Sequence, residues 1–97
     1  MYVVIRRYEA DIASSDEVVR RVREGFLPLI QQRPGFVAYH LVDAGDGVIT
    51  SISIFRDHAE ANESTRNAAE WVKANLAELV QGPPEIISGK VVLSEEA

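Results

Sequence analysis

Pro34–Phe55, with the sequence PGFVAYHLVDAGDGVITSISIF, decides the fold of this chain. The segment predicts two strands, Phe36–Val42 and Val48–Phe55, joined by a loop at Asp43–Gly47 that is rich in Gly and Asp. Successive side chains of a strand point to opposite faces, and here apolar side chains fall on both of them. Antiparallel sheets with one face in water alternate apolar and polar residues instead. We therefore expect both faces of this hairpin to be covered.

The rest of the chain adds a strand and a helix on each side of this hairpin. Tyr2–Tyr8 predicts the first strand, and apolar residues at helical spacing over Val18–Ile30 predict the first helix. A second helix is predicted over Asp57–Val80, and Ile86–Leu93 predicts the last strand. The order β-α-β-β-α-β, with right-handed crossovers, predicts a ferredoxin-like α+β fold: a four-stranded antiparallel sheet with two helices on one face. We expect one domain over residues 1–97.

Two irregularities are expected in the helices. Pro28 lies within the first helix and should kink its last turn, because proline lacks an amide donor and crowds the preceding turn. The second helix would be about 36 Å long at ~1.5 Å per residue, whereas a strand of eight residues covers only about 27 Å. We therefore expect a break or bend in the polar run Asn62–Asn67.

The composition excludes several classes of protein and site. The chain has no cysteine, so it has neither disulfides nor thiolate chemistry. A net charge of -5 argues against nucleic-acid and anionic-membrane partners, which need clustered Lys and Arg. No apolar stretch approaches the ~20 residues that span a bilayer. No signal-peptide pattern follows Met1, so we expect a cytoplasmic protein. Two isolated histidines supply no metal site, and we expect neither a metal nor a cofactor.

The face of the sheet opposite the helices needs a cover of its own. Several large apolar side chains left in water would form a patch of the size that marks an interaction site. Burial of each such side chain contributes on the order of 1.5–3 kcal/mol. We therefore expect a homodimer that packs sheet face against sheet face. The alternative is that the helices cover one face well and that the remaining apolar residues are scattered on the surface.

This order of elements, this length and the entry Pro34-Gly35-Phe36 into the second strand resemble the dimeric α/β-barrel superfamily. Within it, the chain is most similar to small proteins of the antibiotic-biosynthesis-monooxygenase-like type. The resemblance implies a dimer with an open cavity between helices and sheet. It also implies activities that range from cofactor-independent oxygenation of aromatic, quinol-like substrates to haem degradation, and many members have no known activity.

Haem degradation in this superfamily goes with particular residues. Members that degrade haem typically have Asn near the end of the first strand, and a Trp and a His on the second helical segment. Here Arg7, or Arg6 if the register shifts by one residue, stands at the first of these positions. Trp71 is present but no His follows it, and His58 stands at the start of the helical segment. These differences argue against haem degradation.

The resemblance directs the Tyr39 face of the hairpin toward the helices and the other face toward the partner subunit. If Val42 pairs with Val48, two residues lie opposite one another when their numbers add up to ninety. A four-residue loop would instead shift the pairing by one residue and change which side chains share a face. The helix side then carries polar and small side chains inside an apolar shell, as a small-ligand pocket requires. The candidate ligand-binding residues are Arg7, Tyr39, Ser51 and Ser53 on the sheet, and Ser64, Trp71 and Asn75 on the second helix. The candidate dimer-interface residues are Phe36, Ala38, His40, Ile52 and Ile54.

Each candidate also has a structural alternative. Trp71 would close the rim of the core instead of stacking on a ligand, and Tyr39 would be a core aromatic. Arg7 would pair with an acid such as Glu85 or Glu95 instead of binding an anionic substrate. His40 is the better acid–base candidate because its ordinary pKa lies near neutrality, but on the partner side it would be a structural histidine.

Three functions remain open at this point. The first is a cofactor-independent monooxygenase acting on a small aromatic or quinol-like substrate. The second is a non-catalytic small-ligand-binding or stress-associated dimer that uses the same helix–sheet cavity. The third is a dimer without a ligand, in which core side chains fill that gap.

Overall fold

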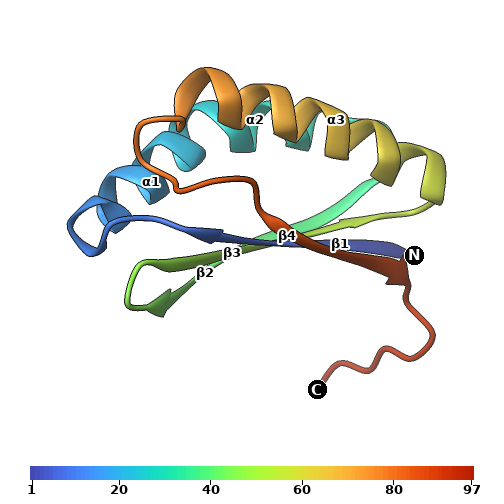
Figure 1. Ribbon diagram of the computed structural model, residues 1–97. Helices are drawn as coiled ribbons and strands as arrows, with labels where there is room; N and C mark the ends of the chain where they lie inside the picture. Colours follow the sequence, from blue (N-terminus) through green and yellow to red (C-terminus); the bar gives the residue numbers. More distant parts are fainter.

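A computed structural model of all 97 residues shows a four-stranded antiparallel sheet with a helical layer on one face (Figure 1). The strands are β1 (Tyr2–Glu9), β2 (Phe36–Gly45), β3 (Val48–Phe55) and β4 (Glu85–Lys90). Their order across the sheet is β2-β3-β1-β4, so the first strand lies in the interior and the last at an edge. The predicted fold is confirmed. β4 is shorter than predicted, since it ends at Lys90.

The first helical segment is continuous but irregular. It consists of η1 (Ile12–Ser14), α1 (Ser15–Arg21), η2 (Val22–Phe26) and α2 (Leu27–Gln31), and η2 is a π-helical turn. Pro28 lies in the first turn of α2, directly after the π-helical turn, and has no amide donor for the turn before it. The wider π-helical turn precedes the proline, so the predicted irregularity lies about one turn earlier than expected.

The second helix, α3 (His58–Asn75), is shorter and straighter than predicted. It runs through Asn62–Asn67 without interruption, so the predicted break there is wrong. The helix ends instead at Asn75, and its 18 residues span about 27 Å, the length of an eight-residue strand. At its start Asp57 acts as the N-cap, and its Oδ1 accepts a hydrogen bond from the amide of Glu60 at 2.9 Å.

The hairpin differs from its predicted register. Asp46 and Gly47 both have positive φ, 54° and 82°, which suits a tight turn between twisted strands. His40 pairs with Ile52, whereas the predicted register paired it with Thr50. Because the shift is two residues, most side chains stay on their predicted faces. Phe36 is the exception, because a bulge at Val37 makes it pair with Phe55 and turns it to the helix side.

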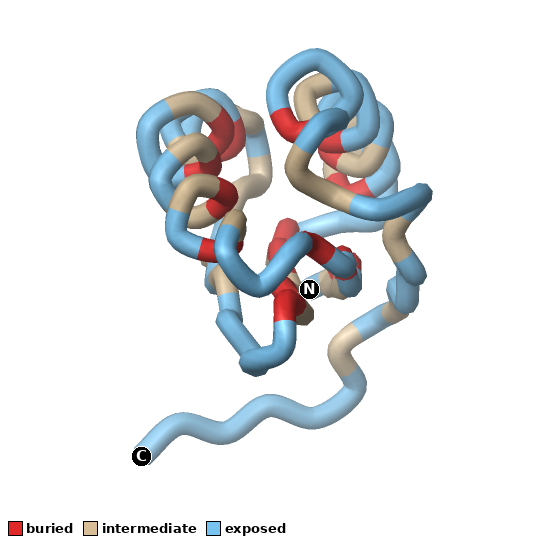
Figure 2. The backbone as a smooth tube through the Cα atoms, turned by 60° about the vertical axis from the view of Figure 1, so that its left-hand side comes forward, coloured by how far each residue is buried: buried red, intermediate tan, exposed pale blue.

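The core lies between the sheet and the helices, where the buried residues of Figure 2 gather. Its side chains come from both helical segments and from the inner face of β1 and β3, among them Val4, Val18, Val22, Phe26, Ile30, Ile49, Phe55, Ala61 and Leu76.

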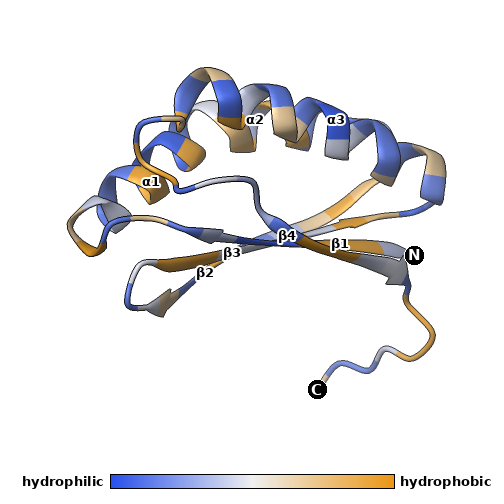
Figure 3. Cartoon of the chain, in the orientation of Figure 1, coloured by the Kyte–Doolittle hydropathy of each residue, from blue (hydrophilic) through white to orange (hydrophobic).

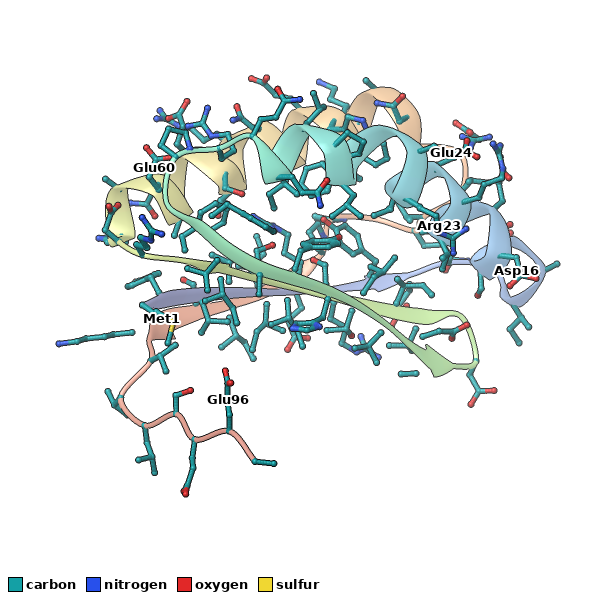
Figure 4. The ribbon with its side chains drawn as sticks, turned by 180° about the vertical axis from the view of Figure 1, so that it is seen from behind. Met1, Asp16, Arg23, Glu24, Glu60 and Glu96 are labelled. Atoms are coloured by element: carbon teal, nitrogen blue, oxygen red, sulfur yellow. The ribbon has the colours of Figure 1, made fainter.

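Figure 3 shows hydrophobic residues along the strands, and the pairing places several of them on the outer face of the sheet. Ile87, Ile5 and Ile52 form a row across β4, β1 and β3. The C-terminal tail, with Glu96, lies on this side (Figure 4). No helix of the structure combines the length and the hydropathy that crossing a membrane requires.

Candidate functional site

Arg6 is the most unusual side chain of the molecule. It lies in the interior strand β1, points toward the helices and is only 2% exposed. Its Nη2 donates to Oγ1 of Thr65 on α3 at 3.0 Å, and this hydroxyl in turn donates to the carbonyl of Ala61. No carboxylate lies within 4.0 Å of the guanidinium. Arg6 is therefore a buried charge without a counter-ion, which proteins ordinarily avoid.

Two tyrosines surround this charge. Burial lowers the pKa of the Arg6 guanidinium, while the neighbouring phenols of Tyr8 and Tyr39 act in the opposite direction. Burial also raises the pKa of Tyr8, which Arg6 partly offsets. For Tyr39, burial and the neighbouring Tyr8 raise the pKa to about 12 against the opposing effects of Arg6 and Ser51. Both phenols consequently keep their protons near neutral pH and can donate hydrogen bonds.

The space at the centre of the helix–sheet layer is small. It measures about 20 Å³, room for roughly one water molecule. Aromatic side chains fill most of the gap: the ring of Phe26 lies 5.7 Å from that of Tyr39 and 5.4 Å from that of Trp71. Trp71 lies against Gly25, where an added Cβ would stand 2.9 Å from its Cζ2. Trp71 therefore closes the seam between the two helical segments.

A much larger cavity opens beside this seam, between α3, β1, β4 and the segment that joins α3 to β4. Its volume is about 530 Å³, within the ~300–1,000 Å³ typical of small-molecule pockets. Arg6 and Tyr8 line it together with Thr65 and Val72 of α3, and the segment with Pro83 frames its mouth. Arg6, Tyr8 and Val72 also line the small inner space, so the two are neighbours. We call the larger one the Arg6 cavity.

The predicted ligand-binding residues separate into several places. Tyr39, Ser51 and Trp71 meet at the small inner space and do not line the Arg6 cavity. Ser53 is fully buried, and its hydroxyl has no hydrogen-bond partner. Ser64 lies in a cleft of about 40 Å³ between the helical segments.

The two remaining ligand-binding candidates lie away from the inner space. Asn75 donates its side-chain amide to the Trp71 carbonyl at 2.9 Å. Arg7 faces away from the helices, is exposed and pairs with Glu9 at 3.1 Å, so it does not line the predicted pocket. The acids expected as its partner, Glu85 or Glu95, are not the one with which it pairs.

The predicted interface residues mostly lie on the outer face. Ala38, His40, Ile52 and Ile54 are there by their pairing. Phe36 is not: its ring packs edge-on against Phe55 at 6.1 Å, on the helix side.

Sequence reasoning missed Arg6, Tyr8 and Thr65. The alternation of β1 contained a signal, because Arg6 and Tyr8 are two residues apart and must share a face. The sequence does not show whether this face is the buried one, because Val4 on the Arg6 face and Ile5 on the opposite face are both apolar.

The chain and its fold were compared with known proteins. Residues 1–76 match the family model described as antibiotic biosynthesis monooxygenase. No curated protein matches the chain. The structure of NE2512, a protein of unknown function from Nitrosomonas europaea, is similar with a TM-score of 0.81 and 21% identity, over 99% of this chain and 93% of that one.

Two further structures are similar. The monooxygenase ActVA-Orf6 of Streptomyces coelicolor, in complex with Nanaomycin D, has a TM-score of 0.75 and 20% identity over 96% of this chain and 92% of its own. The heme-degrader MhuD of Mycobacterium tuberculosis, with two hemes in its active site, has a TM-score of 0.77 and 16% identity, over 99% of this chain and 100% of its own. These likenesses show the fold. The family match spans 76 of the 97 residues, and the chain belongs to the antibiotic biosynthesis monooxygenase family.

Proposed function

We propose that this protein is a cofactor-independent monooxygenase that binds a small hydroxy-aromatic, quinol-like substrate as an anion in the Arg6 cavity. The observation that carries the proposal is the buried guanidinium of Arg6, which has no carboxylate partner and lines a cavity of about 530 Å³. An anionic ligand there would form charge-assisted hydrogen bonds and supply the missing counter-ion. Thr65 Oγ1 occupies Nη2 and orients the guanidinium.

The chemistry follows from placing a phenol beside this charge. A guanidinium in a site of low dielectric lowers the pKa of a bound phenol, so that the phenolate forms near neutral pH. The phenolate is electron-rich and reduces O2 without a flavin or metal. A ring C–H ortho or para to the phenolate becomes C=O as the phenol is oxidised to a quinone; one oxygen atom of O2 enters the product and the other leaves as water. The substrate supplies all the electrons, and Tyr8, which keeps its proton, donates a hydrogen bond to the anion.

Two relatives of similar fold support a ligand-binding role. ActVA-Orf6 is a monooxygenase and was solved with Nanaomycin D, and MhuD was solved with two hemes. Both therefore bind a small-molecule ligand on this fold. Their identities to this chain, 20% and 16%, carry no substrate over, so the proposal depends on Arg6.

Oxygen consumption with a panel of dihydroxy-aromatic compounds tests this proposal. Arg6→Met removes the charge from the cavity, and Arg7→Met is the matched control because it removes the same charge from the adjacent, outward-facing residue. A lost hydrogen bond to a charged group is worth about 1.5–3 kcal/mol, so we expect Arg6→Met to lower kcat/KM about 10- to 100-fold. Arg7→Met should match the wild type. No uptake above background, or equal activity of both variants, would refute the proposal.

A non-catalytic ligand-binding protein is the second candidate. The observation that favours it is the wall of the Arg6 cavity, which includes no His, Asp or Glu to act as a general base. Under this alternative the same hydroxy-aromatic compounds bind with the same dependence on Arg6, but no oxygen is consumed. Calorimetry beside the oxygen electrode separates the two candidates.

We also propose a homodimer that buries the outer face of the sheet. Ile87 is 61% exposed there and lies in one row with Ile5 and the half-buried Ile52. Val42, which is 42% exposed, lies on the same face of β2 as His40. A patch of this kind on a soluble domain is typical of an interface. Sedimentation should give a dimer at micromolar concentration, and Ile52→Asp should give a monomer. A monomeric wild type would refute this proposal.

A further inference from the structure

The wall of the Arg6 cavity carries two positive charges and no negative one. Arg6 and Lys73 line it, whereas the chain as a whole has 15 acidic and 10 basic residues besides histidine. The nearest acids of the same elements point elsewhere. Glu70 lines a groove on another side of α3. Glu85 lies opposite Arg7 in the β1–β4 pairing and so points to the outer face of the sheet. The positive charge is therefore a property of this cavity and not of the surface around it.

Lys73 has no partner within the protein. It makes neither an ion pair nor a hydrogen bond with another side chain. Ala69 lies four residues before Lys73 and Ala77 four residues after it. Both alanines line the cavity together with Lys73. Neighbours this small leave the lysine side chain free to reach toward the cavity.

The two cations are anchored at different points along the cavity wall. The guanidinium of Arg6 is fixed to Thr65 by the 3.0 Å hydrogen bond. Lys73 follows Thr65 by eight residues on the same helix, which places its backbone about 12 Å further along the axis at ~1.5 Å per residue. Apolar side chains line much of the rest of the cavity, among them Val72, Val80 and Ile86. This arrangement suits a flat apolar body with an anionic group at each end.

We infer that the substrate is an aromatic hydroxy acid, whose phenolate lies at Arg6 and whose carboxylate is bound by Lys73. The inference builds on the proposed function, which supplies the phenolate end of the cavity, and adds a residue that determines specificity. A lysine ammonium is a suitable partner for a carboxylate at a solvated mouth, because it is a strongly hydrated charge on a flexible stem. The deeper, drier position holds the arginine.

Calorimetric binding of a hydroxynaphthoic acid and of its methyl ester tests the inference. The acid has its two groups at opposite ends of the rings, and the ester lacks only the negative charge. Partly exposed ion pairs contribute up to ~1 kcal/mol, so Lys73→Gln should weaken binding of the acid about 2- to 5-fold and leave the ester unchanged. Lys90→Gln is the matched control, since Lys90 is the other lysine of the chain and does not line the cavity. It should bind both compounds as the wild type does.

The outcomes separate this inference from the proposed function. Equal affinity of the wild type for acid and ester, or an unchanged affinity of Lys73→Gln for the acid, would overturn the carboxylate site. The phenolate site would still stand if Arg6→Met weakened binding of the ester. If neither compound bound the wild type, or if Arg6→Met bound both normally, the proposed function would fail together with the inference.

Discussion

Replacing Arg6 by methionine is expected to stabilise the fold while it lowers the proposed activity. The guanidinium is 2% exposed and has a single protein partner, the Thr65 hydroxyl. The methionine side chain has a similar length, is flexible enough to fill the space of the Arg6 side chain and needs no hydrogen bond. The variant therefore removes a desolvated charge and introduces apolar contacts in its place.

The magnitude follows from two opposing contributions. Desolvation of an unpaired buried ion costs several kcal/mol, and its removal is a gain. The lost hydrogen bond from a charged donor costs about 1.5–3 kcal/mol. Thr65 keeps its own bond to the Ala61 carbonyl, so no buried polar group is left without a partner. We expect a net stabilisation of about 1–3 kcal/mol, which raises Tm by at least about 4 °C in a domain of this size.

Urea unfolding at neutral pH and one fixed protein concentration measures this difference. Arg7→Met is again the control, and as an exposed substitution it should stay within about 0.5 kcal/mol of the wild type. A decrease of more than about 1 kcal/mol in Arg6→Met would refute the reasoning. It would show that the guanidinium supports the fold, and its burial would no longer indicate an anionic ligand.

Three further predictions concern the fold. Asp57→Ala removes the N-cap of α3 and should lower the free energy of unfolding by about 1 kcal/mol in a urea titration; no change would argue against the cap. Gly47→Ala should cost at least about 1 kcal/mol more than Gly45→Ala. Both glycines have positive φ, but only a Cβ at Gly47 would meet the carbonyl oxygen of Ala10, at 2.1 Å; equal costs would contradict this contact. The pKa of Tyr39 is raised to about 12 from 10.0, so its contribution to stability is complete below pH 10 and is lost as the pH rises toward 12. Tyr39→Phe should remove that part of the alkaline loss, and an unchanged alkaline profile would contradict it.

The fold could be predicted because its signals are local and repeated. The apolar hairpin, the helical stripe and the order of the elements all indicate the same topology. The end of α3 was harder to predict, because Leu76–Val80 contains good helix formers. A tertiary contact decides it: Val80 bridges Ala10 next to β1. The chain therefore leaves the helix at Asn75, and the Arg6 cavity opens where it turns away.

The site could be predicted only in part, since it depends on which face of its strand each side chain occupies. Arg6 and Arg7 are adjacent, identical and flanked by apolar residues on both faces, so composition cannot tell which one is buried. The bulge at Val37 had the same effect on Phe36, because one extra residue in a strand reverses the faces of the residues before it. Neither feature has a sequence signal that a single chain reveals.

The segment that frames the Arg6 cavity affects how fast a ligand can enter and leave. Gln81 ties its beginning to β1 through a 2.7 Å bond from its amide to the Glu9 carbonyl, and its side chain donates to Asp11 at 3.1 Å. Pro83 and Pro84 follow with restricted φ. With the mouth shaped in advance, association needs no preceding rearrangement, and its observed rate should rise linearly with ligand concentration. Differences in affinity between ligands would then appear as differences in residence time.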